Sequence, residues 1–146
     1  MKTNNITIRE FRIDDYDDVI ELWGNAGIHY KPNGRESRAR IEKEIKSGQA
    51  VFLVAAVDNR IVGVVLGTHD GRKWWINRLA VTKEFRRQNI ASKLVSAVEA
   101  KLNKFGIEII SCLIEPENDI SRQFFNQLGY TKVPVEYYSK KQSADV

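Results

Sequence analysis

Cysteine, histidine and proline are all scarce in this chain of 146 residues, which has one Cys, two His and three Pro. A lone cysteine excludes an intramolecular disulfide and fits a reducing compartment. So few cysteines and histidines also argue against a metal site. No apolar run approaches the roughly 18 residues of a membrane-spanning helix, and the first residues lack the hydrophobic stretch of a signal peptide. We therefore predict a cytoplasmic protein with no metal ion and no membrane partner.

The residues that are present suffice for one packed core. Hydrophobic residues make up 42% of the chain and include three Trp and six Phe. This composition predicts a single domain over residues 1–146, with its core in 6–139 and a polar tail in 140–146. The net charge of +4 suits a ligand with several phosphate groups, but it does not by itself indicate nucleic acid. Both a monomer and a homodimer are compatible with the sequence.

Hydrophobic periodicity predicts alternating strands and helices. Strands are expected at 6–13, 50–57, 60–68, 73–81, 107–114 and 130–139, and helices near 14–23, 35–46, 90–105 and 120–128. Residues 107–114 are nearly all apolar, which indicates a central strand buried on both faces. Pro134 indicates an edge or a bulge in the last strand, and residues 24–34 are read as an exposed connection. The fold class is α/β, with a mixed, mostly antiparallel sheet flanked by helices.

A predicted strand ends and an amphipathic helix begins within residues 79–92. Apolar residues follow at helical spacing, namely Ile90, Leu94, Val98, Leu102 and Phe105. The first backbone N–H groups of such a helix have no intrahelical acceptor and lie at its positive dipole end. Basic residues just before the helix add to this potential, so the junction is a candidate anion site.

The junction reads Arg86-x-x-Asn89-x-Ala91 and resembles the pyrophosphate loop of the GNAT acetyltransferase superfamily, which is Arg or Gln, two residues, Gly, one residue, then Gly or Ala. Asn89 replaces the first Gly, and asparagine tolerates left-handed backbone angles. A second segment runs from Asn118 to Tyr130 and resembles the family's Asn-x-x-Ala-x-x-x-Tyr-x-x-x-Gly-Phe/Tyr. Both motifs occur in the family's order and separation. The resemblance covers roughly residues 51–138.

The resemblance implies the GNAT fold and acetyl-CoA as cosubstrate. In that fold the strand ending at Val81 and the strand at 107–114 are parallel neighbours that splay apart to admit the pantetheine arm. The resemblance places cofactor contacts at Leu79, Ala80, Val81, Arg86, Arg87, Gln88, Asn89, Ile90, Ala91, Ser92, Asn118 and Phe125. Two structural alternatives stay open, a solvated basic helix start at the junction and a plain N-cap role for Asn118.

Phe125 departs from the family pattern, because many members carry there the Tyr that protonates the leaving thiolate. Phenylalanine cannot donate a proton. Three explanations compete: the thiolate leaves unassisted, another hydroxyl such as that of Tyr130 or Tyr137 substitutes, or the protein binds acyl-CoA without catalysis. We favour the first, because an alkyl thiol has a pKa only modestly above neutral.

The general base is open between two candidates. Glu115 follows the predicted strand at 107–114, where α/β sheets place ligand sites, and His29 lies in the loop at 24–34 with a suitable intrinsic pKa. Each also has a simpler interpretation, as an exposed carboxylate or a solvated loop histidine. Trp74 and Trp75 are expected on opposite faces of their strand, and Cys112 is expected to be a small buried hydrophobe.

The sequence thus predicts an N-acetyltransferase that moves the acetyl group of acetyl-CoA directly to a primary amine in a ternary complex. The acceptor, a small molecule or a protein, is not identified by any residue pattern. The alternative is a non-catalytic acyl-CoA-binding module. A nucleic-acid-binding domain ranks third, because the chain has no such motif and little excess charge.

Overall fold

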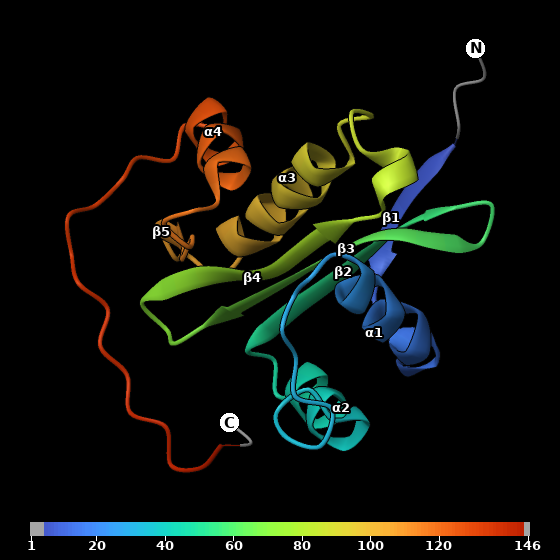
Figure 1. Cartoon of the computed structure of the whole chain (residues 1–146), viewed down its shortest axis with the longest axis horizontal. Helices are drawn as coiled ribbons and strands as arrows, with labels where there is room; N and C mark the ends of the chain where they lie inside the picture. Colours follow the sequence, from blue (N-terminus) through green and yellow to red (C-terminus); the bar gives the residue numbers. More distant parts are fainter. Residues whose placement is uncertain (1–4, 145–146) are drawn as a thin grey trace.

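The computed structural model describes residues 5–144 of the protein (Figure 1). These residues form five strands, four α-helices and two short 3-10 helices. In chain order these are β1 (Ile6–Glu10), η1 (Ile13–Asp15), α1 (Tyr16–Asn25), α2 (Arg38–Lys46), β2 (Ala50–Val57), β3 (Arg60–His69), β4 (Lys73–Val81), η2 (Lys83–Phe85), α3 (Ile90–Asn103), β5 (Ile109–Cys112) and α4 (Asp119–Gln127).

The strands form one sheet in the order of the sequence, β1-β2-β3-β4-β5. The first four pair antiparallel, and β5 pairs parallel with β4. A bulge interrupts the β3–β4 ladder, because Val64 pairs with Ala80 but Leu66 pairs with Asn77. Two β4 residues therefore oppose the single residue between them on β3, and such a bulge bends and twists the strand.

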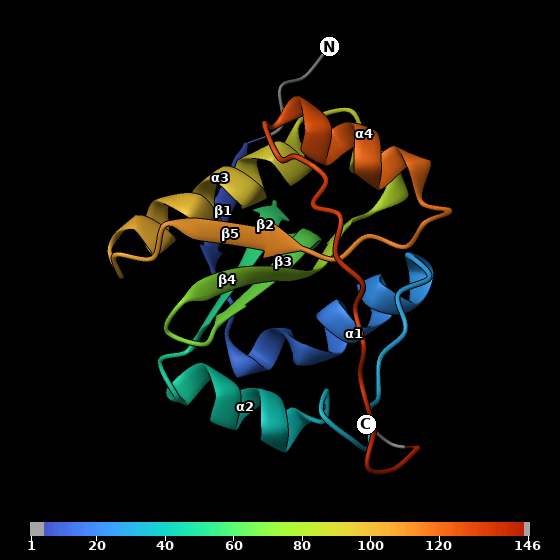
Figure 2. The same ribbon diagram turned by 90° about the vertical axis from the view of Figure 1, so that its left-hand side faces the viewer.

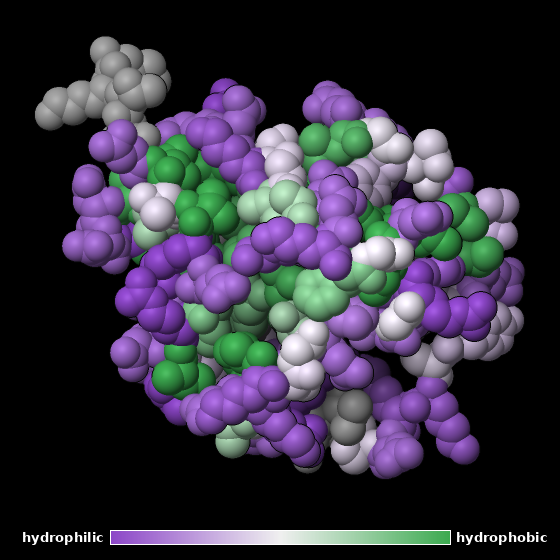
Figure 3. Space-filling view, turned by 180° about the vertical axis from the view of Figure 1, so that it is seen from behind, coloured by the Kyte–Doolittle hydropathy of each residue, from purple (hydrophilic) through white to green (hydrophobic). Residues whose placement is uncertain are grey.

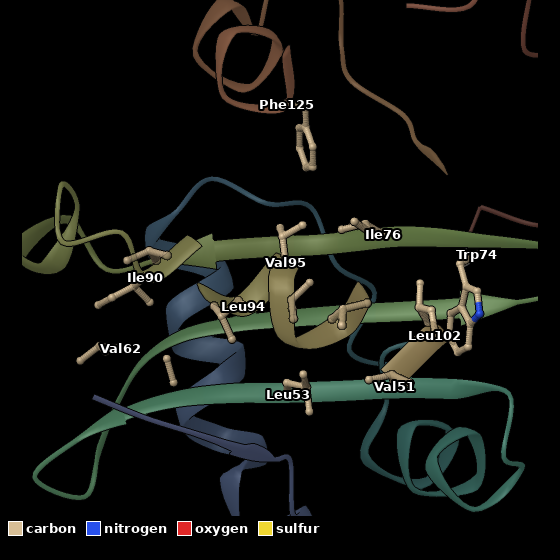
Figure 4. Close-up of a cluster of buried hydrophobic side chains, with 14 of the residues drawn as sticks. Val51, Leu53, Val62, Trp74, Ile76, Ile90, Leu94, Val95, Leu102 and Phe125 are labelled. Atoms are coloured by element: carbon tan, nitrogen blue, oxygen red, sulfur yellow. The ribbon is translucent and has the colours of Figure 1, made fainter. Parts of the chain in front are cut away.

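Helices cover both faces of the sheet, with α3 and α4 on one side and α1 and α2 on the other (Figures 1 and 2). One buried cluster joins α3, α4 and the sheet, and a second joins α1, α2 and the opposite face. Figure 4 shows the first cluster, in which Leu94 and Val95 of α3 project toward the strands. A Cβ atom at Gly63 of β3 would meet side-chain atoms of Ile90 and Leu94 at 3.0 Å. This glycine therefore lets the start of α3 approach the sheet closely.

The fifth strand differs from its prediction. It is shorter, spanning Ile109–Cys112, and it lies at the edge of the sheet with partly or largely exposed side chains. A central strand buried on both faces requires a partner on each side, and among residues 5–144 only β4 pairs with it. The prediction of a central, buried strand was wrong for this reason.

The predicted final strand at 130–139 is also absent. Its residues are exposed from 131 onward and form no ladder. The segment instead runs from the end of α4 along the outside of the molecule to the α1–α2 loop, where the Lys31 Nζ donates to the Ala144 carbonyl at 3.2 Å (Figure 2). Strand-forming residues alone do not make a strand when no neighbour accepts their backbone hydrogen bonds. Residues 1–4 and the end of the predicted polar tail, 145 and 146, lie outside the described range.

The remaining elements follow their predictions closely, apart from the loop after α1. Residues 24–34 were expected to form an exposed connection, but Gly34 is buried. Glu36, expected within the helix at 35–46, is also buried and precedes α2, which begins at Arg38. The back face of the molecule carries mainly hydrophilic side chains with apolar groups between them (Figure 3). No helix within residues 5–144 combines the length and apolarity needed to cross a membrane.

Candidate cofactor site

The second half of β4 presents an open edge next to β5. The parallel ladder joins Lys73 with Ile109 and ends where Ile76 pairs with Cys112. Beyond that point β4 continues to Val81, while β5 has ended. The two strands thus separate as the family resemblance implied, and the backbone of Leu79, Ala80 and Val81 lies in the unpaired stretch. An unpaired strand edge can accept an extended ligand that carries amide groups.

A turn of unusual backbone conformation connects this strand to α3. Asn89 is the N-cap of α3 and has φ 60°, and Arg87 has φ 72°. Asparagine was expected to tolerate the left-handed region at position 89, whereas nothing in the sequence indicated it for Arg87. An arginine with positive φ is uncommon, and such strain concentrates at functional sites.

The turn places free backbone donors at the start of α3. The first intrahelical bond of this helix runs from the Lys93 N–H to the Asn89 carbonyl at 3.0 Å. The N–H groups of Ile90, Ala91 and Ser92 precede that bond, so the helix itself gives them no acceptor. Asn89 makes no side-chain cap to them. These donors lie at the positive end of the helix dipole, an arrangement that suits an anion.

Arg86 and Arg87 place two positive charges in the loop before α3. Both are exposed. The Arg86 Nε donates to the Val81 carbonyl at 3.3 Å, which folds this side chain back over the end of β4. Their positive charges, together with the helix dipole, favour a phosphate group at the turn.

The α4 side of the site consists of Asn118 and Phe125. The Asn118 Oδ1 accepts from the Ser121 N–H at 3.1 Å, so its side chain caps α4 as the simpler interpretation held. Asn118 is exposed, and its Nδ2 group takes no part in that cap. Phe125 is only 7% exposed and belongs to the same buried cluster as Ile90. In Figure 4 its ring points from α4 toward Val95 and Ile76.

The hydroxyl groups proposed to replace the missing Tyr are differently placed. The Tyr130 ring packs against Phe125 at 5.1 Å, and its hydroxyl donates to the Glu99 Oε2 at 2.9 Å. Burial and this bond to a carboxylate raise the pKa of Tyr130 far above the ordinary value of a tyrosine. A phenol held in this way is a poor proton donor to a thiolate. Tyr137 is 71% exposed in the C-terminal segment.

The two candidate bases are both exposed and lie on different elements. Glu115 follows β5, and its carbonyl accepts from the Asn118 N–H at 3.0 Å. His29 lies in the α1–α2 loop, and its carbonyl accepts from the Arg78 Nη1 at 2.5 Å. Trp74 is buried and Trp75 half-buried, consistent with opposite faces, and Cys112 is half-buried with a pKa raised by burial.

A buried ion pair that the sequence analysis missed ties the α1–α2 loop to the β4 bulge. Arg78 lies in the bulge with φ 52°, and its Nη2 bonds the Glu36 carboxylate. The Glu36 side chain is 5% exposed and that of Arg78 is 17% exposed. The Lys31 N–H also donates to Glu36 Oε2 at 2.9 Å. Burial alone would raise the pKa of Glu36, but the bonds from Lys31 and Arg78 outweigh it and hold the pKa below its usual value.

The ion pair brings the loop next to the open half of β4, since Arg78 directly precedes Leu79. The guanidinium also lies over the Trp23 ring at 5.7 Å. No pattern in the sequence could pair Glu36 with Arg78, because 42 residues separate them. The structure alone shows that the buried Gly34 and Glu36 lie in the loop that this pair holds beside the open half of β4.

This combination of an open strand edge, a left-handed turn and free helix N–H groups agrees with a family comparison. Residues 13–130 match the model of the acetyltransferase (GNAT) family. The chain therefore belongs to the GNAT acetyltransferase family. The mixed sheet flanked by helices is the fold expected for that family.

Solved structures of N-acetyltransferases share the fold. A PaiA N-acetyltransferase from Thermoplasma acidophilum, in complex with coenzyme A, superposes with a TM-score of 0.79 at 22% identity over 90% of this chain and 93% of that chain. The glucosamine-6-phosphate N-acetyltransferase from Arabidopsis thaliana gives 0.76 at 19% identity over 95% and 99%. AAC(6')-Iy with the bisubstrate analogue CoA-S-monomethyl-acetylneamine gives 0.78 at 18% identity over 94% and 99%.

Proposed function

We propose that the protein is an N-acetyltransferase that transfers the acetyl group of acetyl-CoA directly to a primary amine. The observation that carries this proposal is the unpaired second half of β4, which leads directly into a turn and a helix start rich in free N–H donors. An extended ligand with amide groups at one end and phosphates at the other matches this order of groups. CoA-bound neighbours of the same fold support the choice of cosubstrate.

In this proposal, the backbone of β4 binds the pantetheine arm like an added strand. The pyrophosphate lies at the turn, held by the side chains of Arg86 and Arg87 and by backbone N–H groups of Arg87, Gln88, Asn89, Ile90, Ala91 and Ser92. The Asn118 Nδ2 donates to the arm, and the Phe125 ring forms an apolar wall beside the thioester. Acetyl-CoA supplies an activated acetyl group, and these residues position it.

The reaction needs few functional groups from the protein. The amine nitrogen forms a bond to the acetyl carbon, the C–S bond breaks, and the amine proton is lost to solvent or a base. A backbone N–H in the bulged part of β4 stabilises the oxyanion in this scheme. Since Phe125 offers no proton and Tyr130 is held by Glu99, the thiolate leaves without an acid.

In this proposal the acceptor binds away from the turn before α3, in the region between the α1–α2 loop and β5. His29 and Glu115 come from these two elements and remain the candidate bases. If Glu115→Gln and His29→Ala both keep full turnover and the pH profile of the parent protein, neither is the base. If the fall in turnover toward acid pH disappears in only one of the two variants, the residue changed in that variant is the base.

A second candidate function is binding of acyl-CoA without transfer. It is favoured by the buried Phe125 and by the engaged Tyr130 hydroxyl, because neither of these two positions offers a free phenol to the leaving group. Acetyl-CoA turnover in the presence of amine acceptors separates the two functions. Release of CoA thiol that depends on an acceptor supports the enzyme, and saturable binding without release supports the binding module.

The cofactor site is tested first by thermal shift with acetyl-CoA, CoA and ATP. We expect a saturable rise in melting temperature with acetyl-CoA and CoA but none with ATP, because only the first two carry the pantetheine arm. The double variant Arg86→Ala, Arg87→Ala should need at least tenfold more acetyl-CoA for the same shift.

The control variant is Arg40→Ala, Lys43→Ala, which removes the same charge from α2 on the opposite face of the sheet. It should respond to acetyl-CoA like the parent protein. An equal loss in both double variants would show that only overall charge matters. No shift at millimolar acetyl-CoA would contradict the cofactor site itself.

A further inference from the structure

Arg78 combines an unfavourable backbone conformation with a side chain that reaches a distant loop. It lies in the β4 bulge, between Asn77, which pairs with Leu66, and Ala80, which pairs with Val64, and its φ is 52°. A long side chain disfavours this left-handed conformation, which glycine and asparagine adopt more easily. Such strain persists only where surrounding contacts fix it. The contacts of the arginine side chain therefore hold the bulge in its shape.

The Arg78 guanidinium makes its contacts outside β4. Its Nη1 donates to the His29 carbonyl at 2.5 Å, and its Nη2 bonds the Glu36 carboxylate. The group also lies over the Trp23 ring of α1 at 5.7 Å. The planar fork of N–H donors in arginine can bind a carboxylate and a carbonyl at once, whereas lysine offers a single point charge. Arginine is thus the residue type that this double attachment requires.

Glu36 joins the α1–α2 loop to α1 as well as to Arg78. The Lys31 N–H donates to the Glu36 Oε2 at 2.9 Å, and the Glu36 N–H donates to the Lys31 carbonyl at 3.1 Å. The Tyr16 hydroxyl of α1 donates to the Glu36 carbonyl at 2.6 Å. These bonds make the loop and α1 one unit, and Arg78 links that unit to β4 by polar contacts.

The backbone and the side chain of Arg78 belong to two different parts of the proposed reaction centre. In the proposed function, a backbone N–H in the bulged part of β4 stabilises the oxyanion, and the cofactor edge begins at the next residue, Leu79. The loop that the side chain holds carries His29 and forms one wall of the acceptor site. A misplacement of about 1 Å between reacting groups can lower a rate by about a hundredfold. The position of the loop relative to the bulge therefore matters for transfer.

We propose that Arg78 is a positioning residue, which together with Glu36 holds the acceptor loop at the distance from the β4 bulge at which an amine reaches the bound thioester. This inference rests on the proposed acetyl transfer, and it adds a residue on which transfer depends but acetyl-CoA binding does not. Arg86 and Arg87 have the opposite role, because their charges lie at the turn before α3.

The test compares two arginines that each hold a carboxylate. Arg78→Asn removes the guanidinium but tolerates the left-handed backbone, and Arg78→Gly relieves the strain altogether. Ile28 and Tyr30 of the loop still pack against the α1 cluster, so both variants are expected to fold. Arg9→Asn is the matched control, since Arg9 holds Asp15 with two bonds of 2.8 and 2.9 Å on β1, which β2 and β3 separate from β4. Melting curves give the temperature at which all variants are folded for the assay.

Transfer is measured as release of CoA thiol with a fixed mixture of n-butylamine, free lysine and glucosamine, which offers primary amines on an alkyl chain, an amino acid and a sugar. The Arg78 variants should lower the amine-dependent rate by about tenfold to a hundredfold and change the KM for acetyl-CoA less than about threefold. Millimolar ethylguanidinium should restore part of the rate in Arg78→Gly, because it supplies again the group that Glu36 binds. Arg9→Asn should keep the rate and this KM within about twofold of the parent values. Arg86→Ala, Arg87→Ala should instead raise the KM for acetyl-CoA.

Hydrogen exchange gives a readout that needs no acceptor. The Lys31 amide, which donates to Glu36, should exchange at least about tenfold faster in Arg78→Asn than in the parent protein, but not in Arg9→Asn. Unchanged exchange of this amide would overturn the proposal. So would intact transfer in Arg78→Asn, an equal loss of transfer in Arg9→Asn, or a rise in the KM for acetyl-CoA as large as the loss of transfer.

Failure of the proposed function gives a different result. A parent protein that shows no thermal shift with acetyl-CoA would contradict the cofactor site, while exchange of the Lys31 amide would still show whether Arg78 holds the loop. A parent protein that binds acetyl-CoA but releases no thiol with the amine mixture would support the binding module and overturn a role of Arg78 in transfer.

Discussion

The part of the sheet formed by β1–β4 is more completely paired and packed than the part formed by β5, and we call these parts the β1–β4 side and the β5 side. From β1 to β4, each strand except β1 has a neighbour on both sides for at least part of its length, and helices bury both faces. On the other side, β5 has four residues, α4 has a single side chain counted as buried, and the segment after it lies exposed. The candidate cofactor site lies at the boundary between the two, where β4 leaves β5.

This difference indicates that the β1–β4 side contributes most of the stability and that the β5 side is the more open of the two. Buried apolar area and satisfied ladders hold the bulge of β4 and the start of α3 rigidly in place. The β5 side leaves backbone groups open, and in the proposed function this opening admits acetyl-CoA and the acceptor. Substitutions of the same chemistry on the two sides should therefore have very different effects.

The largest contrast concerns ion pairs. Glu36→Ala leaves the partly buried Arg78 guanidinium without its carboxylate partner, which should cost about 3 kcal/mol in the free energy of unfolding. Arg122→Ala removes the exposed pair with Asp119 on α4 and should cost less than about 1 kcal/mol. Urea unfolding of both variants at one protein concentration measures the difference. Equal costs would mean that the buried pair is not more important for stability than the exposed one.

A second contrast uses one substitution on both sides. Ile76→Ala empties a position that is 6% exposed on β4 and should cost about 2–4 kcal/mol. Ile120→Ala changes a side chain that is 84% exposed on α4, and its effect should stay within about 0.5 kcal/mol. Melting temperatures rank the variants, and denaturant unfolding gives the magnitudes. A cost above about 1.5 kcal/mol at Ile120 would reveal packing that the monomer does not contain.

Acid and alkaline conditions should weaken different sides. The lowered pKa of Glu36 means that its contribution is complete above the ordinary glutamate pKa of about 4.3 and is lost as the pH falls through the lower folded value. The raised pKa of Tyr130 has the opposite sign, so its contribution is complete below about pH 10 and is lost as the pH rises further.

Variants assign these two losses. In unfolding titrations, Glu36→Gln should remove part of the acid loss, and Tyr130→Phe should remove part of the alkaline loss. Each variant serves as the control for the other, because Glu36 lies on the β1–β4 side and Tyr130 lies between α3 and α4. If Tyr130→Phe changed the loss of stability at acid pH instead, Tyr130 would not be the source of the alkaline loss.

Sequence patterns predicted the well-packed side more accurately than the open side. The hairpin of β2 and β3, the strand β4 and the helix α3 all carry alternation or helical spacing that their neighbours reinforce, so local and tertiary preferences agree. The apolar run at 107–114 and the strand-like run at 130–139 have the same local signals, but their outcome depends on whether a partner strand is available. Local sequence contains no information on that.

The candidate site divides in the same way. The sequence indicated that Asn89 tolerates the left-handed conformation that it adopts, and it predicted the start of a helix with free N–H groups near Ile90, because those features depend on a few adjacent residues. The Glu36–Arg78 pair depends on the return of a distant loop to a β4 bulge, and the left-handed Arg87 depends on the whole turn. Neither follows from spacing or composition.

Phe125 links the two sides, since it belongs to α4 but packs into the cluster of α3 and β4 (Figure 4). We expect Phe125→Tyr to change the rate of acetyl transfer less than about tenfold, because a thiolate derived from an alkyl thiol with a pKa near 8.5 leaves readily without an acid. Phe124→Tyr, one residue earlier and only half-buried, is the matched control for an added hydroxyl. Steady-state rates at saturating acetyl-CoA test the expectation, with melting temperatures to correct for the cost of a buried hydroxyl. A rise of a hundredfold or more in Phe125→Tyr but not in Phe124→Tyr would show that this protein lacks an acid it needs, and would favour the binding module over the enzyme.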